Sequence, residues 1–236
     1  AISKFQPGCY LMNVVKMFSI SQSMASIRRY SQINLLKSES VLEHTGFVCL
    51  FVYFMCEEIN ASCDEKISVG AALQKAALHD IDEVVTGDIP RPTKYYNDES
   101  ERVFSEIADQ GIRQIISEID FPKEASEKIE KNWRTSKSET EGIVVALADL
   151  AAVVYKIWEE VILLGNRKLV TQGKQVYKYI CELSGSLQLQ ESVGTISKEH
   201  KNSLDMVISQ LLIISRQVKD MEDPMIGAIA ALSKEK

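Results

Sequence analysis

The chain has 236 residues, of which 45% are hydrophobic and 25% are charged. This balance is that of an ordinary globular domain, and five prolines and eleven glycines are too few for a disordered chain. A net charge of −6 argues against a surface that binds nucleic-acid polymers, because phosphate backbones are held by an excess of Lys and Arg. Any phosphate that the chain binds is therefore expected to be small and locally enclosed.

The five cysteines point to a reducing compartment. Their number is odd and they lie mostly in apolar helical contexts, so we interpret them as buried thiols rather than as a disulfide framework. The start of the chain shows no signal-peptide pattern, and the apolar run over residues 41–55 is too short to span a bilayer. We therefore expect a cytoplasmic protein without a membrane partner.

Apolar residues recur every three or four positions through most of the chain, and no alternating run is long enough to demand a sheet. The expected fold class is therefore all-α, a bundle of seven or eight helices. The expected helices cover residues 9–26, 40–60, 65–80, 98–118, 123–135, 139–164, 167–190 and 199–218. Ser38 or Ser40 can cap the second helix, and Glu43 can complete a capping box with Ser40.

Residues 86–96, with the sequence TGDIPRPTKYY, interrupt the helical pattern. Two prolines restrict the residues before them to extended conformations, so we expect a rigid loop that positions side chains. After about residue 185 the sequence becomes less distinctive. We therefore divide the chain into a domain over residues 1–185 and a helical C-terminal extension over residues 186–236, which would pack on the domain or on a second subunit.

Two of the three histidines, His44 and His79, lie where apolar helical sequence is interrupted by acids. Asp80 directly follows His79, so both side chains can face one ion at the end of a helix. Imidazole and carboxylate ligands together suit Mn, Fe, Co, Ni or Zn. Taken alone, each histidine is more often an ordinary helix residue than a metal ligand.

Asp149 is the only charged residue in the segment GIVVALADLAAVV, which is expected to be helical and apolar on nearly all sides. A buried carboxylate is costly unless it is paired or bound to a metal. Two interpretations stay open, a buried salt bridge to Lys or Arg and a metal site shared with the two histidines and Asp80. The metal site explains all four residues at once.

Glu83 lies four residues after His79, and Asp88 follows Gly87 in a turn. A carboxylate beside a metal can take a proton from water or deliver one to a leaving group. The plainer interpretation is that Glu83 solvates the end of a helix and that Asp88 only makes a turn.

Arg28, Arg29 and Lys94 are candidate phosphate contacts, since arginine offers a bidentate fork and lysine a point charge. Most such residues are simply solvated. Tyr30 can offer its ring to a sugar or a base, or it can belong to the core.

These residues occur in an order that resembles a known family. The order is R-Y at 29–30, E-H at 43–44, H-D-I-D-E-V-V-T-G-D-I-P at 79–90, P-T-K-Y at 92–95 and A-D at 148–149. Over roughly residues 25–165 it is similar to the HD-domain 5'-deoxynucleotidases of the bacterial YfbR type, which belong to the HD-domain metal-dependent phosphohydrolases. The resemblance implies one divalent metal, with Co, Mn or Zn expected and Mg or Ni as alternatives. The ligands that it implies are His44, His79, Asp80 and Asp149.

The resemblance also implies roles for the other candidates. Glu83 and Asp88 would act on the water or the leaving group, and Arg29 and Lys94 would contact the nucleotide. Tyr30 stands where the family has a tryptophan that helps to exclude a ribose 2'-hydroxyl. A deoxynucleotide substrate and a homodimer or higher homo-oligomer are implied as well.

Three hypotheses follow. The first is metal-dependent removal of the 5'-phosphate from deoxynucleoside monophosphates. The second is a dNTP triphosphohydrolase that releases triphosphate, because related HD enzymes, among them small phage enzymes, destroy dATP in this way. The third is a catalytically silent scaffold that binds nucleotide or a partner protein, although a scaffold has no reason to keep a buried Asp149 beside the other ligands. Analysis of the products separates the first two hypotheses.

Overall fold

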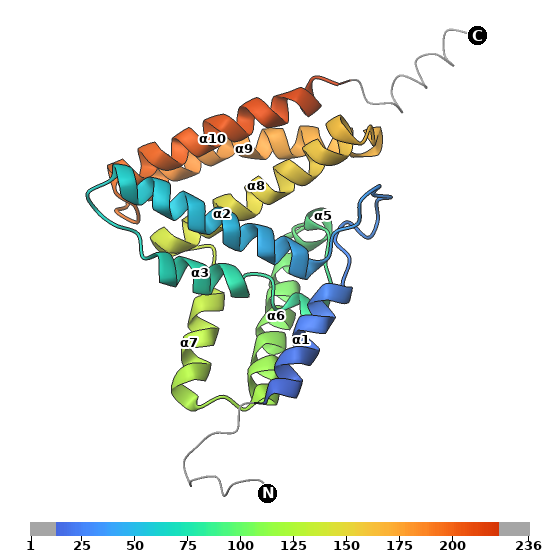
Figure 1. The fold of residues 1–236 in the computed structure, drawn as a ribbon, viewed down its shortest axis with the longest axis vertical. Helices are drawn as coiled ribbons and strands as arrows, with labels where there is room; N and C mark the ends of the chain where they lie inside the picture. Colours follow the sequence, from blue (N-terminus) through green and yellow to red (C-terminus); the bar gives the residue numbers. More distant parts are fainter. Residues whose placement is uncertain (1–12, 222–236) are drawn as a thin grey trace, which may run out of the picture.

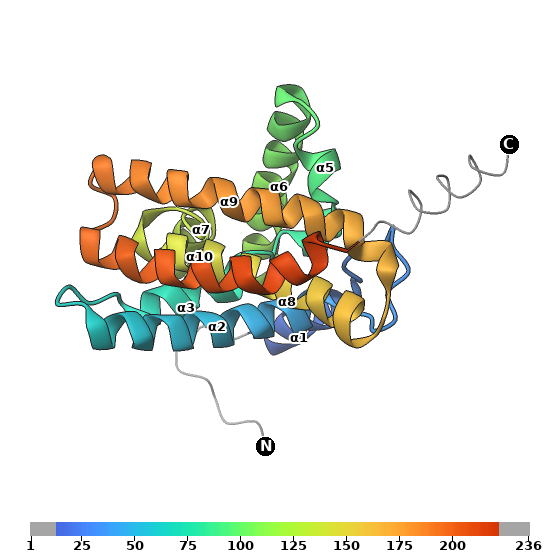
Figure 2. The same cartoon turned by 90° about the horizontal axis from the view of Figure 1, so that it is seen from above.

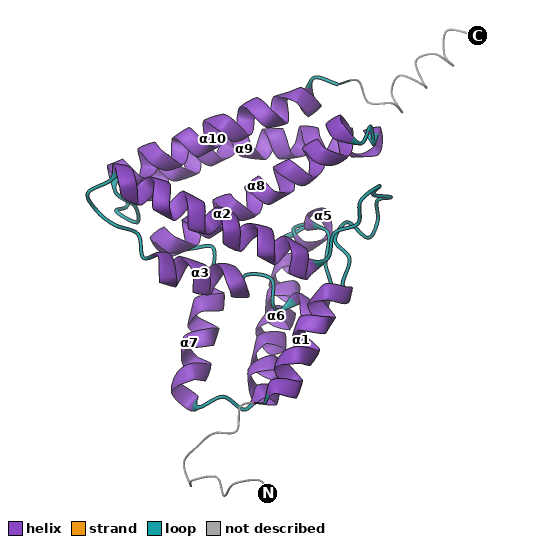
Figure 3. Cartoon of the chain, viewed as in Figure 1, coloured by secondary structure: helices purple, strands orange, loops and turns teal. Residues whose placement is uncertain are grey.

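The computed structural model describes residues 13–221, in which helices are joined by loops (Figure 3). The helices are α1 (Val14–Ser26), α2 (Val41–Ser62), α3 (Val69–Leu78), α4 (Glu83–Thr86), α5 (Arg91–Lys94), α6 (Asp98–Ile119), α7 (Lys123–Arg134), α8 (Glu139–Trp158), a π-helix (Glu159–Leu163), a 3₁₀-helix (Arg167–Leu169), α9 (Val170–Ser192) and α10 (Lys198–Lys219). Residues 13–221 contain no strand, and one isolated bridge pairs Arg28 with Ser40. Eight of these α-helices have ten or more residues, so the expected all-α bundle is confirmed.

Most helix ends lie within a few residues of the positions expected from the sequence. Ser40 caps α2 and forms the expected capping box with Glu43. The helix expected over residues 65–80 is shorter, since Ser68 caps α3 by accepting a hydrogen bond from the backbone of Ala71. The helix expected over 139–164 changes to a π-helix after Trp158. Residues 9–12 of the first expected helix lie outside the described residues.

The segment 86–96 is less irregular than expected. It contains α5, a single helical turn that begins directly after Pro90. Pro92 stands in the first turn of α5, where its fixed φ suits a helix and its missing N–H costs no hydrogen bond. The expectation of a loop throughout this segment is therefore wrong for residues 91–94.

The bundle is arranged around α8. Figures 1 and 2 show α9 and α10 lying side by side over α8 and α2, while α1, α6 and α7 extend away from this layer. α8 packs against α2, α3, α9 and α10, and the main apolar core lies among these helices. Fully buried members of this core include Val48, Val144, Ala148, Ile180 and Leu204. Because α8 is apolar on nearly all sides, a polar side chain on it is held at a definite place in the core.

The predicted boundary at residue 185 falls inside α9. Beyond it, Leu187 and Leu204 belong to the same core as residues of α2 and α8. Residues 222–236, the last part of the predicted extension, lie outside the described residues. The division into a domain and an extension stays a prediction.

Within residues 13–221, no helix combines the length and apolarity needed to cross a bilayer. The described cysteines carry free thiols, of which Cys56 and Cys63 are buried and Cys49 is partly buried. Cys181 is exposed, which differs from the expectation of buried thiols, because it lies on a solvent-facing side of α9. Cys9 lies outside the described residues.

Candidate metal centre and active site

His44 enters the site from the first turn of α2, directly after the capping box that fixes the start of that helix. Its side chain is fully buried. Its Nε2 atom faces Oδ1 of Asp149 at 3.0 Å, and its buried Nδ1 atom has no hydrogen-bond partner among the described residues. The ring is therefore held with one nitrogen toward the centre of the site and the other toward the loop that precedes α2.

His79 and Asp80 lie at the C-terminal end of α3, as the sequence predicts. Nδ1 of His79 is 2.7 Å from the carbonyl oxygen of Ala76, and because a carbonyl only accepts, this nitrogen carries the proton. Nε2 of His79 faces Nε2 of His44 at 3.4 Å. Oδ2 of Asp80 lies 3.1 Å from Nε2 of His79 and 3.6 Å from Nε2 of His44.

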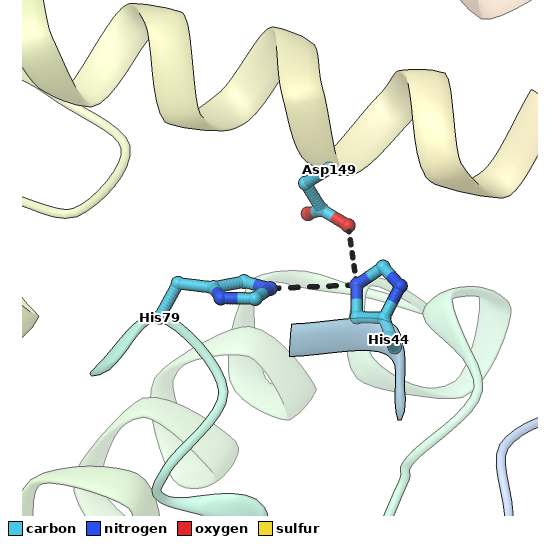
Figure 4. A group of neighbouring side chains, drawn as sticks. All are labelled: His44, His79 and Asp149. Atoms are coloured by element: carbon cyan, nitrogen blue, oxygen red, sulfur yellow. Dashed lines mark hydrogen bonds and ion pairs between the residues drawn. The ribbon is translucent and has the colours of Figure 1, made fainter. Parts of the chain in front are cut away.

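Asp149 reaches the two histidines from the middle of α8 (Figure 4). His44, His79 and Asp149 each offer one ligand atom, and these atoms lie within 4.8 Å of one another. Asp149 also contacts a lysine, since Oδ1 faces His44 while Oδ2 accepts a hydrogen bond from Nζ of Lys137 at 2.8 Å.

The electrostatics of this cluster favour a positive charge at its centre. Burial lowers the pKa of His79, but Asp80 and Asp149 outweigh burial and hold that pKa above its usual value. Conversely, His79 and Lys137 hold the pKa of Asp80 below its usual range although burial opposes them. Burial likewise opposes ionisation of Asp149, but Lys137 and His44 hold its pKa well below the usual range. Both carboxylates are therefore ionised and face imidazole nitrogens, an arrangement that suits a bound cation.

Arg29 joins this cluster through Glu39. Nη1 of Arg29 donates a hydrogen bond to Oε1 of Glu39 at 3.0 Å, and the two side chains are only 11% and 9% exposed. Burial alone would lower the pKa of Arg29, yet Asp80 and Asp149 are among the charges that raise it above its usual value. The guanidinium is thus fixed in a charged state close to the histidines.

Tyr30 and Asp88 contact each other. Oδ2 of Asp88 accepts a hydrogen bond from the backbone N–H of Tyr30 at 2.9 Å, and Tyr30 has the left-handed φ of 58°. Such a backbone is rare for a tyrosine and persists only where its surroundings hold it. The centre of the ring lies 5.4 Å from Cζ of Arg29, and the buried hydroxyl has no hydrogen-bond partner within residues 13–221.

Glu83 is the first residue of α4, and its buried Oε2 atom has no hydrogen-bond partner in the part of the chain that the structure describes. Burial first, and then the carboxylates of Asp80 and Asp88, raise the pKa of Glu83 to about 9. Glu83 is therefore protonated at neutral pH.

Lys94 is the last residue of α5 and lines one small cleft together with Glu83. The other residues of this cleft include Asp82, Thr86, Gly87 and Ile89.

The structure thus brings the four expected ligands together, places Arg29 and Tyr30 on one side and puts Glu83 beside Lys94. Among residues 13–221, the side chain of Arg28 makes only a long, exposed ion pair with Glu43, 3.9 Å between Nη1 and Oε2. Sequence reasoning missed Glu39 and Lys137. Glu39 lies directly before the helix cap, a position that could have drawn attention, whereas Lys137 lies in a polar loop where nothing distinguishes it from its neighbours.

A family model for 5'-deoxynucleotidases of the YfbR-like type matches residues 16–196. The chain belongs to this family. The match is wider than the resemblance over residues 25–165 and takes in most of α1 and the whole of α9. Helices that the motifs do not reach are therefore part of the family's domain.

Two relatives are 5'-deoxynucleotidases. The protein of Vibrio vulnificus is 26% identical over 185 residues, which are 78% of this chain and 93% of that protein. The protein of Pectobacterium atrosepticum is 25% identical over 154 residues, which are 63% of this chain and 74% of that protein.

Solved structures share the fold. An HD-domain phosphohydrolase from Listeria innocua has a TM-score of 0.60 at 22% identity, with 84% of this chain and 98% of that chain covered. The HD phosphohydrolase of cyanophage S-2L, solved with dA and one catalytic Zn²⁺ ion, has a TM-score of 0.52 at 15% identity, with 83% and 95% covered. Family membership and fold together confirm the expected enzyme class, an HD-domain metal-dependent nucleotide phosphohydrolase.

Proposed function

We propose that this chain releases phosphate from deoxynucleoside 5'-monophosphates. The observation that carries the proposal is the convergence of two imidazole nitrogens and two carboxylates beside a buried arginine, in a chain that belongs to the YfbR-like family. Relatives that carry the name 5'-deoxynucleotidase support the choice of substrate. The four proposed metal ligands are His44, His79, Asp80 and Asp149.

The donor set fits a divalent transition metal. The proton on Nδ1 of His79 leaves the lone pair of its Nε2 atom directed at the centre, and Glu39 stands 3.8 Å from Nδ1 of His44 as the carboxylate that would keep a proton there. Two imidazoles with two carboxylates favour Co, Mn or Zn, with Mg or Ni as alternatives. When bound, such an ion neutralises phosphate charge and acidifies water.

Arg29 is proposed to hold the phosphate, since its guanidinium is kept charged and oriented by Glu39. Lys94 is proposed as a second phosphate contact on the cleft that Glu83 lines. Tyr30 is proposed to stand against the deoxyribose, because Asp88 fixes its backbone and its ring lies beside Arg29.

Glu83 is proposed to donate the proton that the leaving group needs. Hydrolysis forms a bond from a water oxygen to phosphorus and breaks the bond from phosphorus to the 5'-oxygen, which must gain a proton. Glu83 carries a proton at neutral pH, and the charge of Asp88 helps to keep it there. Asp88 thereby acts in the same step through Glu83.

The test is incubation of Mn²⁺-loaded or Co²⁺-loaded protein with matched dAMP, AMP and dATP, with free phosphate and triphosphate measured separately. Phosphate from dAMP is the expected result, and Asp149→Ala is expected to abolish it. Asp64→Ala, an exposed aspartate of a loop, is the matched control and is expected to keep full activity. Triphosphate from dATP without phosphate from dAMP would replace the proposal by a triphosphohydrolase, and the absence of product with every metal would favour a silent scaffold.

We also propose a homodimer or higher homo-oligomer that works in the cytoplasm. Phe47, Leu50 and Phe54 are exposed along one side of α2, an apolar surface of the kind that subunits cover. The free thiols of the described cysteines support a reducing compartment. Sedimentation equilibrium of the protein tests the assembly, and a monomer at all concentrations would contradict it.

A further inference from the structure

The loop between α7 and α8, residues 135–138, reaches the proposed metal centre through Lys137. Nζ of Lys137 donates a hydrogen bond to Oδ2 of Asp149 at 2.8 Å, on the opposite side of that carboxylate from His44. The side chain of Lys137 is 51% exposed, whereas that of Asp149 is 19% exposed. The ammonium group therefore lies where the buried cluster meets solvent.

Lys75 of α3 holds this loop in place through hydrogen bonds to its backbone. The side chain of Lys75 is almost completely buried, and its Nζ atom donates hydrogen bonds to the carbonyl oxygen of Thr135 at 3.1 Å and to that of Ser138 at 3.4 Å. It also forms an ion pair with Glu139 at 2.6 Å. A buried ammonium group is strongly unfavourable without its oxygen partners. Because two of these oxygens belong to the backbone of the loop, moving the loop would cost the protein stability, and the loop is held in place.

Two backbone features add to this rigidity. Glu139 has the left-handed φ of 61°, a strained conformation that its surroundings must hold. Gly142, one turn into α8, lies so close to the loop that a methyl group there would collide with the carbonyl oxygen of Thr135. The loop is thus built to present Lys137 at one position.

The approach to the centre is short of free positive charge. Arg29 is 11% exposed and already bonded to Glu39, and Lys94 lines the small cleft that Glu83 lines. The ammonium of Lys137 has three donors, of which one contacts Asp149, its one hydrogen-bond partner among residues 13–221. The other two donors have no hydrogen-bond partner among residues 13–221, so they are available to an anion that reaches the centre.

We propose that Lys137 is a further substrate-binding residue, which donates a hydrogen bond to a phosphate oxygen of the substrate while it stays paired with Asp149. Lys137 and Arg29 then hold the phosphate from two sides of the metal centre, one from the loop before α8 and one from the segment after α1. This proposal rests on the proposed function, because it takes the substrate to be a phosphate ester bound at that centre.

The test measures binding without turnover. Inorganic phosphate and deoxyadenosine are titrated separately into Mn²⁺-saturated protein by calorimetry, and Mn²⁺ is titrated into metal-free protein. For Lys137→Met we expect phosphate affinity to fall about 10- to 100-fold, since a charge-assisted hydrogen bond is lost, while affinities for deoxyadenosine and Mn²⁺ stay within about threefold. Lys137→Arg is expected to retain most of the phosphate affinity.

Lys131→Met is the matched control, because Lys131 is exposed on α7 and away from the cluster. Lys137→Gln replaces the methionine variant if that variant does not fold. Wild-type phosphate affinity in the variant, whether or not Mn²⁺ binding weakens, would overturn the proposal and leave Lys137 as a residue that only positions Asp149. Failure of the proposed function shows separately, as a wild-type protein that binds phosphate but releases none from dAMP.

Discussion

The carboxylate of Glu39 accepts a hydrogen bond from the guanidinium of Arg29, with 3.0 Å between Oε1 and Nη1. The same oxygen lies 3.8 Å from Nδ1 of His44, a buried nitrogen without another partner. One nearly buried carboxylate therefore faces both the proposed phosphate contact and a proposed metal ligand. Outer partners of this kind orient a metal-bound histidine and strengthen its bond to the ion.

We expect Glu39→Gln to weaken both kinds of binding. The substitution keeps the shape of the side chain but removes the charge that Arg29 and His44 face. Loss of an outer partner typically costs about 10- to 100-fold in metal affinity, and loss of the arginine's anchor is expected to raise the KM for dAMP about 10-fold. Calorimetry with Mn²⁺ and steady-state kinetics measure the two effects.

Glu57→Gln serves as the control for Glu39→Gln, since Glu57 is exposed on α2. It is expected to change neither the affinity for Mn²⁺ nor the KM. If Glu39→Gln left both quantities at wild-type values, the carboxylate would have no part in orienting Arg29 or His44.

The raised pKa of Glu83 predicts a pH dependence of stability in the metal-free protein. The folded protein keeps this proton up to about pH 9, whereas the unfolded chain loses it above about pH 4.5, because burial and the carboxylates of Asp80 and Asp88 disfavour the ionised form. Unfolding thus releases a proton, so stability falls as pH rises between these values. The slope from this group is at most about 1.4 kcal/mol per pH unit.

Glu83→Gln removes this dependence and is expected to make the metal-free protein more stable than the wild type at neutral pH, while activity is lost. Urea unfolding in the presence of a chelator, at about pH 5 and about pH 8, gives the two free energies of unfolding for each protein. The free energy of unfolding of Glu83→Gln is expected to exceed that of the wild type by more at about pH 8 than at about pH 5. Parallel pH profiles of wild type and variant would show that Glu83 is ionised throughout.

Glu160 fixes the loop that follows Tyr30. Its fully buried carboxylate accepts hydrogen bonds from the backbone N–H groups of Leu36 at 2.9 Å and Lys37 at 2.8 Å, and it pairs with Lys156 at 3.3 Å. Glu160→Gln removes one of the two carboxylates that face the buried ammonium of Lys156, which keeps Glu159 at 3.3 Å and the carbonyl oxygen of Lys37 at 2.6 Å. We expect Glu160→Gln to lower the free energy of unfolding by about 3 kcal/mol, measured by urea denaturation.

The exposed pair of Glu99 and Arg102 on α6 provides the comparison for Glu160. Glu99→Gln is expected to leave the urea midpoint unchanged, because exposed ion pairs contribute little. An equal effect of the two substitutions would mean that the contacts of Glu160 are as weak as those of a surface pair.

The sequence was sufficient for the features that depend on local patterns. Apolar spacing predicted the long helices, Ser40 and Glu43 predicted the start of α2, and the apolar surroundings of Asp149 predicted a carboxylate held in the core. Each of these follows from residues within a few positions of one another, where periodicity and capping act.

Local sequence patterns could not predict the features that depend on contacts between residues far apart in the chain. Lys137 belongs to the site only because Lys75, on another helix, fixes its loop, and the sequence around Lys137 is simply polar. Glu39 acquires its role when the backbones of Arg29 and Glu39 pair across a turn. The π-helix after Trp158 carries Glu160, whose backbone partners Leu36 and Lys37 lie more than one hundred residues earlier in the chain.

Gly142→Ala tests whether the loop before α8 must lie where it does. In an exposed helix interior, alanine is favoured over glycine by about 1 kcal/mol. At Gly142 the added methyl group would instead meet the carbonyl oxygen of Thr135 and the backbone of Lys137. We expect the collision to outweigh the helix preference, so that the melting temperature falls and the displaced Lys137 binds inorganic phosphate more weakly.

Gly185→Ala is the matched control, since Gly185 lies in α9 and, among residues 13–221, no atom beyond its own stretch of helix lies within 4 Å of the added methyl group. This variant is expected to raise the melting temperature and to leave phosphate binding unchanged. The comparison separates the helix preference, which the two variants share, from the contact with Thr135, which only Gly142→Ala makes. A melting temperature that rises equally in both would mean that the loop moves aside at no cost, and Lys137 would then not be held at a fixed position.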